Sequence, residues 1–167
     1  MIISATPAKL TQYLKTQEDR DNGMWNGHNW DGRTWVFTED WSVHIKTATY
    51  EIFLTIRKGF KTDGGSIPPP ADTLIRPMGM YLLAWLVHDA IYAAELMARV
   101  KGDWVMLEIL QHQRMGWFLR NGVYCAVEAG GAAVWASHRP SQVARDRELM
   151  DFKYIGEVPR HLINKDR

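Results

Sequence analysis

The hydrophobic period of this chain changes from two to between three and four at a run of three prolines, Pro68–Pro70. Before the prolines, segments 41–46 and 51–57 alternate apolar and polar residues, which predicts two half-buried strands. Residues 34–37 predict a third strand, and the short connections indicate antiparallel pairing. After the prolines, the apolar residues recur at helical spacing. We therefore expect an α+β fold in which a small antiparallel β-meander packs on about three α-helices.

Several helices are expected from apolar spacing and end signals. Thr6 and Pro7, followed by apolar residues at helical spacing, predict a short N-terminal helix over 7–18. Gly102 offers a stop for the first main helix, and Gly130 and Gly131 would allow close helix contact while weakening a later one. The main helices are expected at 81–96, 104–119 and 123–135. A short polar helix over 141–150 and an extended tail complete the chain.

Length and composition exclude several classes of protein. A chain of 167 residues is expected to form one domain. Its segments are an N-terminal helix and Trp-rich loop (1–32), antiparallel strands (33–58), a Gly/Pro loop (59–70), helices (78–137), and a C-terminal helix and tail (138–167). The formal net charge is +1 without long runs of one sign, so nothing indicates nucleic-acid binding. A single cysteine, Cys125, excludes an intrachain disulfide and a cysteine-based zinc site.

Targeting and membrane signals are not evident. The first residues lack the basic start and apolar core of a secretory signal, so we expect synthesis in the cytosol. The most apolar stretch, 78–87, ends at His88 and Asp89 and is shorter than the roughly 20 residues that cross a bilayer. We therefore expect no transmembrane span. The sequence also lacks the Gly-x-Ser-x-Gly, His-Glu-x-x-His and phosphate-loop motifs, which disfavours those enzyme classes.

Two polar blocks near the middle of the chain form the candidate site. The first, at 59–68, is a glycine-rich turn that contains one carboxylate, Asp63, and the second, at 88–92, begins with His88 and Asp89 on an apolar helix. Burying an imidazole and a carboxylate without partners costs several kcal/mol, on the order of 2–7 for a polar group, so partners are expected. We predict that the two blocks meet in one polar centre. Its further members are Thr62, Ser66 and Tyr92.

The same blocks resemble an uncharacterised family, domain of unknown function 1353, found mainly in bacteriophages and bacteria. The resemblance rests on Gly-Phe-x-Thr-Asp-Gly-x-Ser-Ile-Pro at 59–68, His-Asp-x-x-Tyr at 88–92 and Asp103, and extends over about 35–135. The family has no settled activity, so the resemblance implies a phage or prophage context only. It favours a virion or tail-associated protein whose partners are other phage proteins.

The helical half is also similar to phospholipase A2 enzymes, in which a His-Asp pair follows a glycine-rich calcium loop. This resemblance implies a cation-assisted hydrolase, with His88 as general base and a calcium ion as cofactor. The implied calcium ligands are Asp89, Asp63 and the carbonyl groups of Gly64 and Gly65. The chain departs from those enzymes because it has no disulfides and its loop does not directly precede the helix.

The partner of His88 depends on where the first helix ends. A helix continuous to about residue 100 would leave His88 roughly 18 Å from the connecting turn, at 1.5 Å per residue. Asp103 reaches His88 only if that helix ends soon after Tyr92. Otherwise Glu108 or His112 comes closer, although their spacing is also that of a solvated surface pair.

Each candidate also has a purely structural interpretation. Asp103 after Gly102 has the pattern of a helix N-cap, and Asp63 suits a tight turn. His88 and Asp89 suit a buried polar lock between sheet and helix, without any reaction. Two functions therefore remain open, a non-catalytic phage virion module and a hydrolase acting on a lipid ester or cell-wall bond. Four tryptophans either contact cell-wall glycan or cap the sheet: Trp25, Trp30, Trp35 and Trp41.

Overall fold

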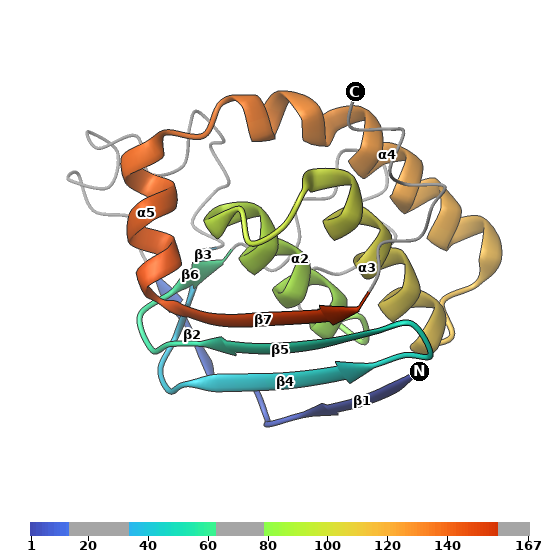
Figure 1. Cartoon of the computed structure of the whole chain (residues 1–167), viewed down its shortest axis with the longest axis horizontal. Coiled ribbons are helices and arrows are strands. Elements are labelled where there is room, and N and C mark those ends of the chain that lie inside the picture. The colour runs from blue at the N-terminus through green and yellow to red at the C-terminus, as the bar shows by residue number, and fades with distance from the viewer. Residues whose placement is uncertain (14–33, 63–78, 157–167) are drawn as a thin grey trace.

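The computed structural model describes residues 1–13, 34–62 and 79–156, which contain two antiparallel sheets and four helices (Figure 1). The larger sheet has the order β1-β4-β5-β7 and the smaller the order β2-β3-β6. The α+β class predicted from the sequence is confirmed. The strands are β1 (Ile2–Ala5), β2 (Leu10–Tyr13), β3 (Thr34–Phe37), β4 (Trp41–Lys46), β5 (Tyr50–Ile56), β6 (Lys61–Thr62) and β7 (Met150–Gly156). The helices are α2 (Leu82–Ala94), α3 (Arg99–His112), α4 (Trp117–Ala136) and α5 (Pro140–Glu148).

The larger sheet forms where the alternating pattern predicts it. Val43 of β4 and Leu54 of β5 are paired in register and buried, whereas Ser42 and Thr55 are paired on the opposite face, where their hydroxyl groups lie 2.8 Å apart. One face of the sheet is therefore apolar and packs against the helices, and the other is polar.

The helices form a layer over the apolar face of the larger sheet. Helix α2 lies at its centre, with α3 beside it, and α4 and α5 form an outer arc (Figure 1). α2 is apolar on most sides, as expected of a helix surrounded by other elements. Its buried residues are Ala84, Trp85, Leu86, Val87, Ala90, Ile91, Tyr92 and Ala94. No helix among the described residues is both long and apolar enough to span a bilayer.

Three segments differ from the prediction in how they pair, because pairing between distant segments overrides local pattern. Leu10–Tyr13, expected in a helix, forms β2 and pairs with β3. β3 pairs with β2 and β6 and not with β4, so the three predicted strands do not form one meander. The expected extended tail forms β7, which pairs with β5 along its whole length.

Two helix boundaries also differ from the prediction. Gly102 lies inside α3 and does not end a helix. A Cβ atom at this position would approach Ile91 Cγ2 of α2 to 2.7 Å. This glycine allows α2 and α3 to pack closely. The helix expected at 104–119 is divided where Arg114 adopts a left-handed φ of 62° and Met115 turns into the core, so that α4 begins at Trp117.

Candidate functional site

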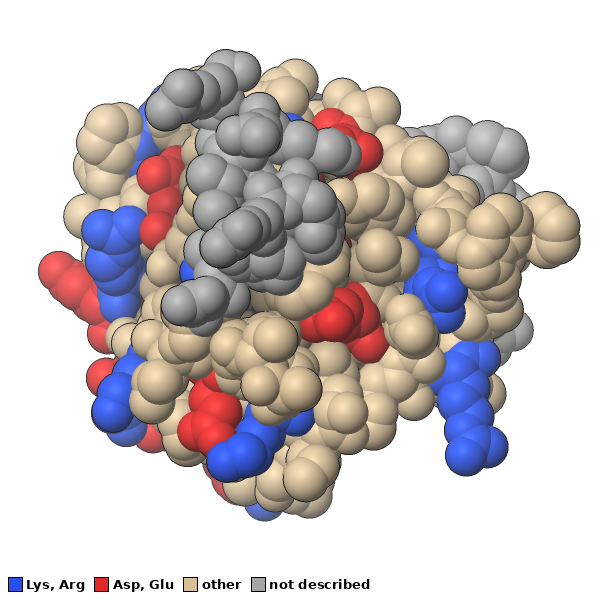
Figure 2. All heavy atoms as spheres, turned by 45° about the vertical axis from the view of Figure 1, so that its right-hand side comes forward, with Lys and Arg blue, Asp and Glu red and all other residues tan. Residues whose placement is uncertain are grey.

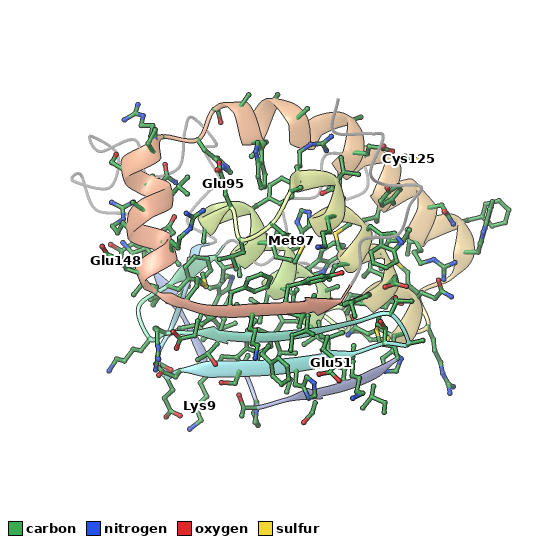
Figure 3. All side chains as sticks on the ribbon, viewed as in Figure 1. Lys9, Glu51, Glu95, Met97, Cys125 and Glu148 are labelled. Atoms are coloured by element: carbon green, nitrogen blue, oxygen red, sulfur yellow. The ribbon has the colours of Figure 1, made fainter. Side chains whose placement is uncertain are left out.

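Helix α2 ends two residues after Tyr92, and this early end creates the site. Glu95 adopts a left-handed conformation with φ of 46°, and the Leu96 amide donates to the Ile91 carbonyl over 3.1 Å, as in a Schellman cap. Arg147 of α5 holds this end by donating to the carbonyl oxygens of Ala94 and Glu95 at 3.0 and 3.1 Å. Figure 3 shows Glu95 between the end of α2 and the junction of α4 with α5. The chain then turns quickly enough for Asp103 to lie beside α2.

Asp103 is the centre of a buried hydrogen-bond network. Its Oδ1 atom lies 3.0 Å from His88 Nε2 and accepts a 2.6 Å bond from the Tyr92 hydroxyl. Its Oδ2 atom accepts a 2.8 Å bond from Arg99 Nη1, one helical turn earlier on α3. The side chain is 1% exposed, and both carboxylate oxygens are bonded, so the burial of this charge is compensated by an ion pair and two further donors.

His88 is fixed on one side only. Its side chain is 12% exposed and its ring lies 4.2 Å from that of Tyr92, measured between centroids. Within the described residues the hydrogen bond of the ring runs through Nε2 to Asp103. The Nδ1 atom is therefore the ring nitrogen that remains available to another group.

Tyr92 is held as a hydrogen-bond donor by its surroundings. Burial, and then the hydrogen bond to the Asp103 carboxylate, raise the pKa of the Tyr92 hydroxyl well above its usual value. The phenol consequently stays protonated at neutral pH. Helix α4 supports it from the other side, where the Trp135 ring meets the Tyr92 ring edge-on at 5.1 Å. A Cβ atom at Gly131 would collide with the Tyr92 hydroxyl, so glycine is required for this approach.

The glycine-rich block reaches α2 through Thr62. The Thr62 hydroxyl, 1% exposed, donates to Asp89 Oδ2, which joins β6 to α2 next to His88. The predicted members Asp63, Gly64, Gly65 and Ser66 lie outside the described residues. Within the described part of the chain no three metal-ligating side chains gather.

The alternative partners of His88 have other roles. Glu108 accepts a 2.6 Å hydrogen bond from the Tyr50 hydroxyl, and burial raises the pKa of its carboxyl. His112 is exposed at the end of α3. The interpretation of Glu108 and His112 as a solvated pair is wrong, and so is the N-cap interpretation of Asp103, which lies in the second turn of α3.

Of the four tryptophans proposed to contact glycan, two lie among the described residues and two do not. Trp41 is 2% exposed, and its indole donates to the Thr6 carbonyl over 2.8 Å, so it is a core residue of the larger sheet. Trp35 is half-buried in β3. Trp25 and Trp30 lie outside the described residues, and the idea of glycan contact there stays a prediction.

Sequence reasoning did not find two supports of the site, Arg99 and Gly131. Arg99 had a local signal, since a basic residue four positions before Asp103 can form an ion pair within a helix. Gly131 was expected to allow close helix contact. That it contacts Tyr92 could be known only from the packing of α4 in the structure.

Comparison with known proteins gives one match. No curated protein and no solved structure matches the chain. The profile of a family described as "protein of unknown function (DUF1353)" matches residues 35–127, which include most of β3, all of β4 to β6, the His88–Asp103 pair and Arg99. Since this is more than half of the chain, the protein belongs to the DUF1353 family.

Proposed function

We propose that His88 and Asp103 form the general-base centre of a hydrolase. The observation that carries the proposal is the asymmetry of the imidazole. Its Nε2 atom is 3.0 Å from a buried carboxylate, whereas Nδ1 has no hydrogen bond within the described residues. A carboxylate on one ring nitrogen fixes the tautomer and orients the other nitrogen for proton transfer, which typically contributes 10²- to 10⁴-fold to a rate.

In this proposal, His88 removes a proton from a water molecule that attacks an ester or amide bond of a lipid or cell-wall molecule. The imidazolium then gives this proton to the alcohol or amine that leaves as the bond breaks. Asp103 stabilises the imidazolium that forms, and Arg99 and Tyr92 hold its carboxylate group in place because both donate to it. Arg99 and Tyr92 are positioning residues. The oxyanion partner and the cation are not assigned to described residues, so no step here runs through a metal ion.

A non-catalytic virion or tail-associated protein is the second candidate. One observation favours it: the Asp103 network joins α2, α3 and, through the bond of Arg99 to the Glu128 carbonyl at 3.4 Å, α4. A carboxylate that connects three helices also suits a structural lock. The bacteriophage context of this candidate rests on the resemblance of the sequence motifs alone.

His88→Gln separates the two candidates. We would assay the full chain on p-nitrophenyl acyl esters, phospholipid vesicles and peptidoglycan, with and without calcium, and measure unfolding in urea. The hydrolase requires turnover that falls at least about 100-fold in His88→Gln while the midpoint of unfolding changes little. Absence of turnover by the wild type on all three substrates, with a large loss of stability in His88→Gln, favours the structural lock.

Tyr81→Phe serves as the matched control, since Tyr81 precedes α2 and no hydrogen bond of its hydroxyl group is found in the described residues. Retention of full activity in this variant shows that the assay responds to the imidazole and not to any change near α2. An equal loss in both variants contradicts the assignment of His88 as the base.

A further inference from the structure

The corner between α3 and α4 exposes large apolar side chains that the core does not use. Phe118 is 86% exposed, Met80 78% and Trp117 63%. The rings of Trp117 and Phe118 meet edge-on with centroids 4.8 Å apart. Gln113 of the turn donates to the Met80 carbonyl over 3.0 Å, which places the start of α2 on the same corner. We call Met80, Trp117 and Phe118 the apolar corner.

The chain that connects α3 to α4 carries charge of one sign. The stretch 109–127 has no Asp or Glu, but contains Arg114 and Arg120. Arg114 is exposed in the turn, Arg120 is half-buried one turn into α4, and neither forms an ion pair within the described residues. In Figure 2, which brings this side forward, uncharged atoms project from the surface with Lys and Arg side chains beneath them. An apolar projection with basic flanks complements a surface that is apolar inside and anionic outside.

We propose that the apolar corner docks on an anionic lipid surface. Tryptophan and phenylalanine beside the exposed Arg114 suit the boundary between acyl chains and headgroups, where the rings are buried and the guanidinium group stays with the phosphates. The shape favours lipid over a protein partner. Three protruding side chains offer at most about 150–250 Å² each, less in total than the roughly 800 Å² that one partner gives to a stable protein interface.

The docking surface is separate from the proposed base. The first residue of α2, Leu82, is six positions from His88, or about 9 Å along the helix axis, and the corner lies beyond Leu82 on the side away from Glu95. The inference therefore stands independently of the proposed hydrolysis. Its test is binding, not turnover, so that failure of one does not imply failure of the other.

Co-sedimentation of the full chain with vesicles tests the proposal. We would use phosphatidylcholine alone and phosphatidylcholine with about a third of phosphatidylglycerol. We expect the wild type to bind the vesicles that contain phosphatidylglycerol, and salt to weaken this binding. Binding should be at least about tenfold weaker in the Trp117→Ser/Phe118→Ser double variant and about tenfold weaker in Arg114→Glu. Phe53→Ser is the matched control, because Phe53 is 39% exposed on the face of β5 opposite to the buried one, and it should bind as wild type.

Three results would overturn the proposal. The first is that the wild type binds neither kind of vesicle. The second is that the double variant binds as well as the wild type while circular dichroism shows that both are folded. The third is concentration-dependent self-association, measured by light scattering, that disappears in the double variant. That result assigns the corner to a second copy of the chain, in line with the exposed outer face of α4 that carries Cys125 (Figure 3).

Discussion

At the scale of single residues, the tyrosine hydroxyl beside Asp103 makes the sharpest stability prediction. Tyr92→Phe removes a 2.6 Å bond to a buried carboxylate and leaves the ring packing intact. Because hydrogen bonds to charged groups contribute about 1.5–3 kcal/mol, we expect a loss of about 1–2 kcal/mol in the free energy of unfolding. Urea denaturation measures it. Tyr81→Phe should lie within about 0.5 kcal/mol of wild type, and an equal effect of both variants would contradict the network.

The residue scale also shows what sequence alone could predict of the site. The motif predicts that Thr62, His88, Asp89 and Tyr92 lie in one polar centre. In the structure Thr62 donates to Asp89, and Tyr92 donates to Asp103. The partner of His88 was left open, because it depends on the left-handed turn at Glu95. A non-glycine residue in that conformation has no reliable local signal.

At the scale of elements, two neighbouring glycines of α4 give a matched pair of substitutions. A Cβ atom at Gly131 would collide with the Tyr92 hydroxyl, whereas one at Gly130 would meet nothing within 4 Å. Alanine is favoured over glycine in a helix by about 1 kcal/mol. We therefore expect Gly130→Ala to stabilise the protein by about 0.5–1 kcal/mol, and Gly131→Ala to destabilise it by about 1–3 kcal/mol through overpacking.

Thermal or urea unfolding of the two glycine variants gives the comparison directly. The Gly131→Ala variant should also lose the Tyr92–Asp103 hydrogen bond, so combining it with Tyr92→Phe should cost less than the two single losses together. Strict additivity of the two substitutions would show that α4 does not act on the site through Tyr92.

Strands and helices were predictable where the hydrophobic periodicity was strong and where contacts with distant segments did not set their boundaries. The alternation over 41–46 and 51–57 gave β4 and β5 with their buried faces correct. The alternation of Met150, Phe152 and Tyr154 was equally available, and it was missed because the charged residues between them resembled a tail. The N-terminal strand β2 lacks such a signal, since its pairing with β3 involves residues more than twenty positions apart.

At the scale of the whole molecule, a buried carboxyl on α5 makes stability depend on pH. Burial raises the pKa of Asp146 from 3.8 to about 6, against the opposing effects of Arg145 and Lys61. The folded state therefore binds more protons than the unfolded state between these values, and stability falls as pH rises from about 4 to about 6. The expected fall is on the order of 2–3 kcal/mol.

Asp146→Asn tests this pH dependence. The variant should be more stable than wild type at pH 7 and should show a flatter dependence between about pH 4 and 6 in urea titrations. Burial also raises the pKa of Glu108, so the stability of the variant should still fall somewhat as pH rises. Glu148→Gln is the control, since Glu148 lies exposed on the same helix (Figure 3). A wild-type stability that rises over this interval would contradict the account.

The whole-molecule arrangement was predictable in class and not in topology. Strands followed by helices indicated an α+β fold, which the structure confirms. The second sheet and the return of the C-terminal β7 to β5 were not predictable, because both depend on contacts between segments far apart in sequence. The early end of α2 followed by α3 brings Asp103 to His88, so the proposed centre depends on this wider packing.

The most direct measurement of the central claim is the tautomer of His88, read from a long-range ¹H–¹⁵N spectrum of the full chain at pH 8. If Asp103 orients the base, Nε2 carries the proton and Nδ1 is unprotonated, and Asp103→Asn weakens this preference. A proton on Nδ1 with an unprotonated Nε2 in the wild type would contradict the claim that His88 presents a free lone pair from Nδ1.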